Sequence, residues 1–305
     1  MSEYCIELDH ITKKFGSFTA VDDISLHLEA GKIYGIVGPN GAGKSTTMAL
    51  IMGSLFPTNG KGSVYGHPLA SKEALQNLGY SPEFTSFYTD MSCQEYLYYM
   101  GCLSGLKPKD AVKRTEELLE QFELKDHALR RVSKFSTGMK KKVSLAQAMI
   151  HDPKILLLDE PTANLDPTSR QEILETVRNM VYQKNQTVII SSHVLTELET
   201  VINHVLMIDH GKIILDAPIS EAQEMFRQGI LIVDTSDNDR LCQQLPEYTF
   251  DKVEDGLRIR TADADLLKKK IVEVVYKEDL LLKTLREEKI SLDSLYRQVM
   301  EGENK

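Results

Sequence analysis

The sequence predicts an α/β fold with a parallel-sheet core, followed by a smaller α+β domain. The segments Ile33–Val37, Ile155–Leu158 and Thr187–Ser191 are apolar and short, as buried parallel strands are. Near residue 220 the pattern changes to short strands that alternate with two helices. A chain of 305 residues is long enough for two compact units. We therefore predict domains over residues 1–220 and 221–305.

The first domain is expected to begin with antiparallel strands and to contain an inserted helical subdomain. Ile6–Leu8 and Ile24–Leu28 alternate apolar and polar residues, as strands do when one face is buried. Residues 92–130 have helical apolar spacing, and Lys107–Asp110 has the proline of a helix start. These features predict a helical subdomain over about residues 84–150. Its expected apolar anchors are Leu97, Leu103, Leu118, Leu119 and Phe122.

The second domain is predicted from the order of its elements. The order is βαββαβ, which is that of a ferredoxin-like fold. A terminal helix is expected over Ser291–Met300, with Ser291 as its cap. The six expected elements are strand 230–234, helix 237–245, strand 248–253, strand 257–259, helix 264–276 and strand 280–285.

Composition limits the classes of function. Lys and Arg number 36 against 45 Asp and Glu, a net charge of −9, so we expect no nucleic-acid partner. The four cysteines lack metal-ligand or CxxC spacing, which favours packing thiols in a reduced, cytosolic protein. No run of roughly 18 apolar residues occurs, so the chain is expected neither to span a membrane nor to be secreted.

A glycine-rich segment after the strand Ile33–Val37 matches the pattern GxxxxGK[ST]. Its glycines let backbone N–H groups surround phosphates, and the N-terminus of the next helix favours their negative charge. Lys44 is predicted to reach the β- and γ-phosphates, and the Ser45 hydroxyl to contact Mg²⁺, which prefers oxygen ligands. The predicted nucleotide-binding residues are Gly38, Pro39, Asn40, Gly41, Ala42, Gly43, Lys44, Ser45 and Thr46.

Two acids follow the apolar strand Ile155–Leu158. Open α/β sheets bind ligands at the carboxyl ends of their strands, so both carboxylates are expected there. Asp159 is predicted to hold Mg²⁺, directly or through water. Glu160 is predicted to adjoin the γ-phosphate and to orient or deprotonate the attacking water. An acidic strand end alone is more often a helix cap, but the glycine-rich loop favours the catalytic interpretation.

Three further segments give the sequence a resemblance to a known family. Phe135–Met139 stands where the ABC (ATP-binding cassette) ATPase family has its LSGGQ signature, Ala163–Asp166 resembles the family's D-loop, and Ser191–His193 resembles its H-switch. They occur in the family's order and spacing, together with the glycine-rich loop and the acidic strand end. Residues 3–220 therefore resemble an ABC nucleotide-binding domain.

The resemblance implies a homodimer that encloses two ATP molecules. Each phosphate loop would pair with the partner's signature segment, so Ser136, Thr137 and Gly138 would contact ATP across the interface. Ser136 can also cap the helix that follows it, where N–H groups favour a γ-phosphate. A simple helix cap is the alternative for this serine.

The resemblance implies three more roles in ATP binding and hydrolysis. Asp166 would lie in the D-loop beside the nucleotide. His193 would hydrogen-bond the γ-phosphate and link it to the water and Glu160. Phe15 would stack on adenine, where the family usually has tyrosine, with burial in the core as the alternative.

Three positions depart from the family pattern. Thr137 and Met139 replace the usual glycine and glutamine of the signature, and a methionine there resembles the drug- and peptide-exporting branch. Glu83 replaces the glutamine of the Q-loop. Its carboxylate keeps an oxygen for Mg²⁺, loses the amide donor and adds negative charge near the triphosphate. Glu83 is therefore predicted as a catalytic residue and a metal ligand. Such an E-loop resembles that of ATPases that protect lantibiotic producers, and other exporters have it too.

The favoured function is the ATPase subunit of an exporter for a drug, peptide or bacteriocin-like compound. ATP and Mg²⁺ are the expected cofactors, and the homodimer would drive a separate integral-membrane permease from the cytoplasmic face of the cell membrane. One alternative is a soluble ABC ATPase of translation or DNA repair, which would need a second cassette or a long coiled coil. Another is an importer, which uses the same chemistry. A generic kinase or GTPase would lack the signature, the D-loop and His193 together.

Overall fold

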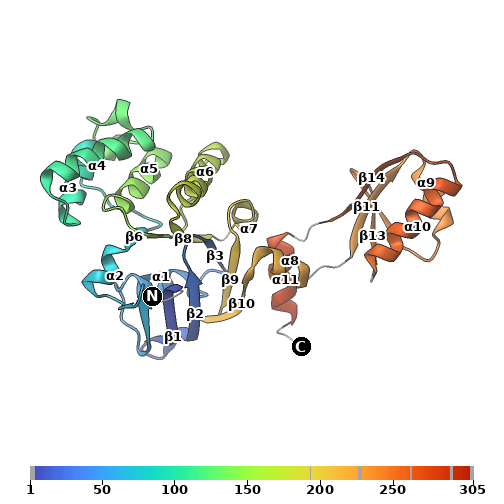
Figure 1. Ribbon diagram of the computed structural model, residues 1–305, viewed down its shortest axis with the longest axis horizontal. Coiled ribbons are helices and arrows are strands. Elements are labelled where there is room, and N and C mark those ends of the chain that lie inside the picture. The colour runs from blue at the N-terminus through green and yellow to red at the C-terminus, as the bar shows by residue number, and fades with distance from the viewer. Residues whose placement is uncertain (1–3, 193, 226–228, 262, 289–290, 303–305) are drawn as a thin grey trace. The chain divides into compact units, whose positions relative to one another are not determined.

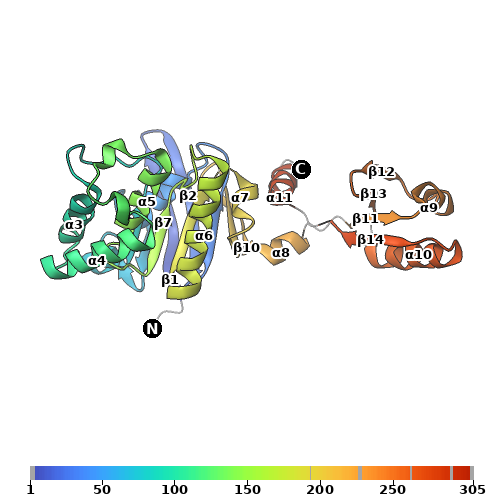
Figure 2. The same cartoon turned by 90° about the horizontal axis from the view of Figure 1, so that it is seen from above.

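The computed structural model describes residues 4–192, 194–225, 229–261, 263–288 and 291–302 (Figures 1 and 2). The chain forms two compact units, one up to Ile219 and the other from Ser220 on. In the described part of the chain, no helix is both long and apolar enough to cross a bilayer.

The first unit opens with an antiparallel sheet whose strand order is β2-β1-β4-β5. Both N-terminal strands extend well beyond the short segments predicted, because positions facing the core continue to carry apolar residues such as Ile11 and Val21. The four strands are β1 (Tyr4–Phe15), β2 (Phe18–Glu29), β4 (Asn59–Val64) and β5 (His67–Pro68).

A six-stranded sheet of order β10-β9-β3-β8-β7-β6 forms the centre of this unit. Its pairs are parallel except the pair of β10 with β9. Every residue of the three strands predicted from apolar runs is buried, as expected for strands covered on both faces. The strands are β3 (Ile33–Val37), β6 (Leu78–Ser81), β7 (Ile155–Leu158), β8 (Thr187–Ser192), β9 (His204–Asp209) and β10 (Lys212–Pro218).

The helical part predicted within the first unit is present, and in both views α3, α4 and α5 gather at one side (Figures 1 and 2). Helix α3 begins with a capping box between Ser92 and Glu95, and α4 begins at Pro108 as predicted. The helices of the unit are α1 (Lys44–Ile51), α2 (Lys72–Gln76), α3 (Cys93–Leu103), α4 (Pro108–Gln121), α5 (Thr137–Ala148), α6 (Pro167–Lys184) and α7 (Leu195–Leu198), with 3₁₀ turns at Lys125–His127 and Val132–Lys134.

One predicted anchor of this helical part is wrong. Leu103 is 61% exposed, because α3 ends at this residue and a turn through Ser104 and Gly105 follows. The other four anchors, Leu97, Leu118, Leu119 and Phe122, are buried.

The second unit contains an antiparallel sheet of order β12-β13-β11-β14. Two helices supply Leu241, Leu267 and Ile271 to one apolar core with the sheet. The predicted cap of the last helix is confirmed, because the Ser294 N–H donates to Ser291 Oγ at 3.2 Å. The elements are α8 (Ile219–Met225), β11 (Ile230–Thr235), α9 (Asn238–Gln244), β12 (Phe250–Val253), β13 (Gly256–Arg260), α10 (Ala264–Lys277), β14 (Leu282–Glu287) and α11 (Leu292–Gly302).

Candidate functional site

The glycine-rich loop joins β3 to α1 in a conformation that requires glycine. Gly43 precedes α1 with a φ of 110°, and a Cβ there would lie 2.6 Å from the Ala20 carbonyl oxygen. At Gly38 a Cβ would lie 2.1 Å from the carbonyl oxygen of Ile208. The loop can therefore pass close to neighbouring backbone only with glycine at these positions.

Lys44 lies buried against the loop that precedes it. Its Nζ donates to the carbonyl oxygens of Gly38 at 2.7 Å and Pro39 at 3.1 Å. Burial lowers the pKa of Lys44, and the carboxylates of Glu160 and Asp159 oppose this effect. The lysine thus lies in the field of both predicted acids, next to a loop suited to phosphate.

Asp159 connects the loop with two strands. Its Oδ1 accepts hydrogen bonds from Ser45 Oγ at 3.1 Å and from Ser191 Oγ at 2.7 Å. The strand register explains the second contact, since Leu158 of β7 pairs with Ile190 of β8 and so brings the next residues of both strands level. These carboxylate and hydroxyl oxygens are suitable ligands for a hard cation such as Mg²⁺.

Glu160 is buried and has an unusual backbone conformation. Its φ of 47° lies in the left-handed region, which residues other than glycine seldom adopt. The Glu160 N–H donates to Ser191 Oγ at 2.9 Å, and its carbonyl oxygen accepts from the Ala163 N–H at 3.1 Å. Ser191 therefore holds both acids, a role that its place in the H-switch segment did not reveal.

Glu83 follows β6 and is partly buried. The register of β6 with β7 places Ser81 opposite Leu158, so the segment after β6 runs beside Asp159. Lys141 of α5 donates to the Glu83 carbonyl oxygen at 2.8 Å. The predicted Q-loop position is thus next to the acidic strand end.

The signature segment and Asp166 form a second group of residues. Ser136 caps α5 by accepting a hydrogen bond from the Met139 N–H at 3.3 Å, and Ser136 itself is exposed. Asp166 caps α6 in the same way, and hydrogen bonds from Ser169 lower the pKa of its carboxyl group. A Cβ at Gly138 would lie 3.2 Å from Ser169 Oγ, so the starts of α5 and α6 adjoin.

Another predicted site residue, Phe15, belongs to the antiparallel sheet. Phe15 lies at the end of β1 and is 48% exposed, which excludes burial in the core as its role. The Lys13 ammonium lies 5.2 Å from the centre of its ring. His193 lies outside the described residues.

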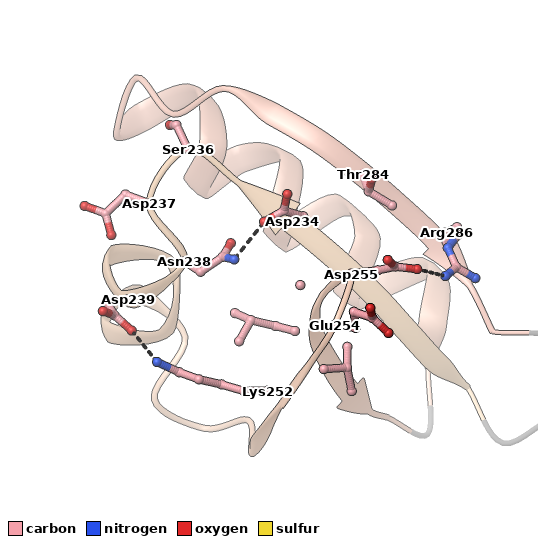
Figure 3. Close-up of a pocket in the computed structure, with 13 residues that line it drawn as sticks. Asp234, Ser236, Asp237, Asn238, Asp239, Lys252, Glu254, Asp255, Thr284 and Arg286 are labelled. Carbon is pink, nitrogen blue, oxygen red and sulfur yellow. Dashed lines mark hydrogen bonds and ion pairs between the residues drawn. The ribbon is translucent and has the colours of Figure 1, made fainter.

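A cavity of about 880 Å³ lies in the second unit and contains none of the predicted site residues (Figure 3). Acidic side chains line it at the start of α9 and around the β12–β13 turn. Asp239 pairs with Lys252 at 3.3 Å, and Asp255 pairs with Arg286 at 3.2 Å. These two acids of the lining thus have cations of their own.

Comparisons with known proteins agree with this geometry. Residues 21–163 match the family model described as ABC transporter. The chain is 34% identical over 225 residues to the bacitracin transport ATP-binding protein BcrA of Bacillus licheniformis, covering 73% of this chain and 72% of BcrA. It is 36% identical over 211 residues to the linearmycin resistance ATP-binding protein LnrL of Bacillus subtilis, covering 68% of each. The chain belongs to the ABC transporter family.

The fold supports the same assignment. The solved ATP-binding subunit of an ABC transporter superposes with a TM-score of 0.66 at 25% identity, covering 73% of this chain and 93% of that one. As a member of the family, this ABC ATPase binds and hydrolyses ATP. Its phosphate loop, Asp159 and Glu160 lie together, and the signature residues lie with Asp166.

Ser191 offers a test of how the two acids are held. Ser191→Ala removes one hydrogen bond from Asp159 and one from the Glu160 backbone, so we expect kcat for ATP to fall on the order of 10- to 100-fold. The KM for ATP should change less, because the phosphate loop is untouched. Steady-state ATPase assays measure both constants. Ser104→Ala, which removes a surface hydroxyl at the end of α3, is the control. A wild-type kcat in Ser191→Ala would contradict this account.

Proposed function

We propose that this ABC ATPase powers an exporter as a homodimer that encloses two ATP molecules and drives a separate membrane permease. The observation that carries the proposal is the meeting of Ser45, Asp159 and Glu160 at the carboxyl ends of the central strands. The dimer would act at the cytoplasmic face of the cell membrane, where it would contact the permease.

Mg²⁺ is the proposed second cofactor. Ser45, Asp159 and Glu83 would hold it, and when bound it would neutralise charge on the phosphates. Among the described residues, no group of three or more His, Cys, Asp or Glu could hold a metal. The remaining ligands would therefore come from ATP phosphates and water, as is usual for Mg²⁺.

Hydrolysis is proposed to use Glu160 to orient or deprotonate water. Burial favours this role because a carboxylate with little water around it interacts strongly with a nearby reacting group. Lys44 Nζ would release the carbonyl oxygens of Gly38 and Pro39 and bind the β- and γ-phosphates instead. His193 keeps its predicted role as the link between the γ-phosphate and Glu160.

Export is favoured by the relatives. BcrA is named for bacitracin transport and LnrL for linearmycin resistance, and the relative from Paraburkholderia xenovorans, 34% identical over 214 residues, is a Nod factor export protein. These names refer to more than one compound, so we propose the broad class of drug, peptide or bacteriocin-like compounds for this chain.

The homodimer is proposed from the exposure of the signature group. Ser136 and Thr137 are exposed at the start of α5, where free N–H groups favour a phosphate from another subunit. A dimeric cassette bound to ADP and Pi has been solved, with a TM-score of 0.64 and 21% identity, covering 70% of this chain and 98% of that one. Phe15, being half-exposed, is proposed to stack on adenine.

A surface beside Glu83 is the proposed contact with the permease. Phe84 is 75% exposed and Tyr88 is 53% exposed, whereas Tyr96 and Leu97 of the same region are buried. The ring centres of Tyr88 and Tyr96 lie 6.3 Å apart, so the exposed Tyr88 lies beside the buried Tyr96. Such a surface fits an apolar helix from a membrane partner.

The second unit is proposed to be a ferredoxin-like accessory domain. Its antiparallel strand order β12-β13-β11-β14 and its two helices packed on one apolar core support this assignment. We propose the domain boundaries 1–220 and 221–305, close to the division between Ile219 and Ser220.

Glu160→Gln tests the catalytic assignment. The variant keeps the size of the side chain but removes the base, so turnover should fall by about 10²- to 10⁴-fold while ATP binding persists. ATP-bound dimers should then accumulate, which size-exclusion chromatography with and without ATP detects. Glu116→Gln, at an exposed position on α4, is the matched control. Wild-type turnover in Glu160→Gln would refute the role of this residue.

Mixing two inactive variants tests whether Ser136 acts across the dimer. Lys44→Ala removes the phosphate-binding ammonium, and Ser136→Arg blocks the exposed start of α5. A heterodimer of the two should contain one intact site, so the mixture should hydrolyse ATP faster than either variant alone. Tagged copurification establishes that heterodimers form. If they form without activity above the two parents, Ser136 does not act in trans.

Variants of Glu83 test the metal ligand. Glu83→Ala removes both oxygens, so ATPase activity should be lower and should require more Mg²⁺, whereas Glu83→Gln keeps one carbonyl oxygen and should keep substantial activity. Titration of ATPase rate against Mg²⁺ concentration compares the two variants with wild type. Identical curves for wild type and Glu83→Ala would remove Glu83 from the metal site.

A further inference from the structure

Lys141 is a buried cation whose contacts the reaction described so far does not use. It lies on α5, five residues after the capping Ser136, and is only 7% exposed. Its Nζ donates to three backbone carbonyl oxygens, those of Glu83 at 2.8 Å, Glu160 at 3.2 Å and Pro82 at 3.4 Å. An ammonium has three N–H donors, so these carbonyls can satisfy all of them.

Nearby carboxylates favour the charged form of Lys141. Burying an ammonium is costly unless it is hydrogen-bonded and near opposite charge. Burial lowers the pKa of Lys141, while the carboxylates of Glu83, Asp159 and Glu160 oppose this effect. The position therefore suits a charged donor and does not suit an apolar side chain of similar length.

A second residue fixes the same face of α5 to the Glu83 segment. Ser144 lies three positions after Lys141, on the same side of the helix. Its Oγ is 2.8 Å from Ser81 Oγ and 2.7 Å from Thr85 Oγ1. Ser144 of α5 therefore contacts the chain both two residues before Glu83 and two residues after it.

The hydrogen bond from Lys141 to Glu160 helps to hold an unusual backbone conformation. The left-handed backbone of Glu160 costs free energy and persists only where neighbours hold it. Ser191 holds its N–H and Lys141 its carbonyl oxygen. Two side chains from separate elements therefore determine where this residue turns away from β7.

We infer that Lys141 is a positioning residue that couples the signature helix to the hydrolytic site of its own subunit. It holds the main chain of Glu83 and Glu160 at one point, about 7.5 Å along α5 from the Ser136 cap. A shift of α5 when Ser136 meets the partner's nucleotide would reach both acids through this ammonium. The inference rests on the roles proposed above for Glu160 and Ser136.

Kinetics of Lys141 variants test the coupling. Lys141→Met keeps the length of the side chain and removes the donors and the charge, so kcat should fall on the order of 10- to 100-fold with a smaller change in KM for ATP. Lys141→Arg keeps both donors and charge and should recover much of kcat. Lys142→Met is the matched control, because the Lys142 ammonium lies 3.1 Å from the exposed carboxylates of Glu123 and Glu172 and should leave kcat near wild type. Lys141→Gln, which keeps amide donors without charge, replaces Lys141→Met if that variant does not fold, and the same fall in kcat is expected.

The outcomes separate this inference from the proposed function. A wild-type kcat in Lys141→Met, or in Lys141→Gln if it is used, while Glu160→Gln is inactive, overturns the coupling alone. A fall in kcat equal to that of Lys142→Met, or no recovery in Lys141→Arg, overturns it as well. If Glu160→Gln itself turns over ATP at the wild-type rate, the proposed role of Glu160 fails and the coupling fails with it.

Discussion

The Asp159 carboxylate, at the carboxyl end of β7, joins the phosphate loop to the central sheet. It accepts hydrogen bonds from Ser45 at the start of α1 and from Ser191 at the end of β8. Since β8 also pairs with β3, where Val37 lies opposite Ser192, the strand that leads into the phosphate loop ends at the same level. The position of the loop relative to the acids therefore depends on strand register, and a shift of one residue would turn these side chains to opposite faces.

The same site concentrates charge where water is scarce. Four charged residues of the site are buried: Lys44, Lys141, Asp159 and Glu160. The side chains of the first three and the backbone of Glu160 form hydrogen bonds. Buried charges are tolerated when opposite charges and hydrogen bonds surround them, and removing one partner leaves the others uncompensated. The two cations and two acids thus depend on one another, which is why substitution of any of them is expected to affect the whole site.

The sequence predicted those parts of the site that a local pattern determines. The glycine-rich loop and the acids after Ile155–Leu158 are continuous segments whose residue types match their chemistry, and the apolar strands beside them are buried as expected. Ser191 and Lys141 could not be identified in this way, because their contacts depend on register and on how α5 lies against β6. A buried lysine in a helix also has no distinctive neighbours in the sequence.

Errors in the fold prediction have a related cause. Apolar spacing suggested Leu103 as an anchor, but spacing does not indicate where a helix ends, and this residue lies at the last position of α3. The strand β6 has Gly79, Tyr80 and Ser81 after Leu78, so it lacks the apolar run by which its neighbours were predicted. Gly79 is needed there because a Cβ would lie 2.1 Å from the Ala148 carbonyl oxygen. Close packing against α5 thus determines a strand that propensity alone does not indicate.

The two buried lysines of the site differ in whether their partners can be replaced. Lys44 donates to carbonyls of the very loop that is suited to phosphate, so a phosphate oxygen can take their place at little cost in hydrogen bonds. Lys141 donates to the main chain of Glu83 and Glu160, whose carbonyls have no competing ligand in the proposed reaction. The first ammonium is therefore suited to binding that is reversible, and the second to holding the acids in place throughout turnover.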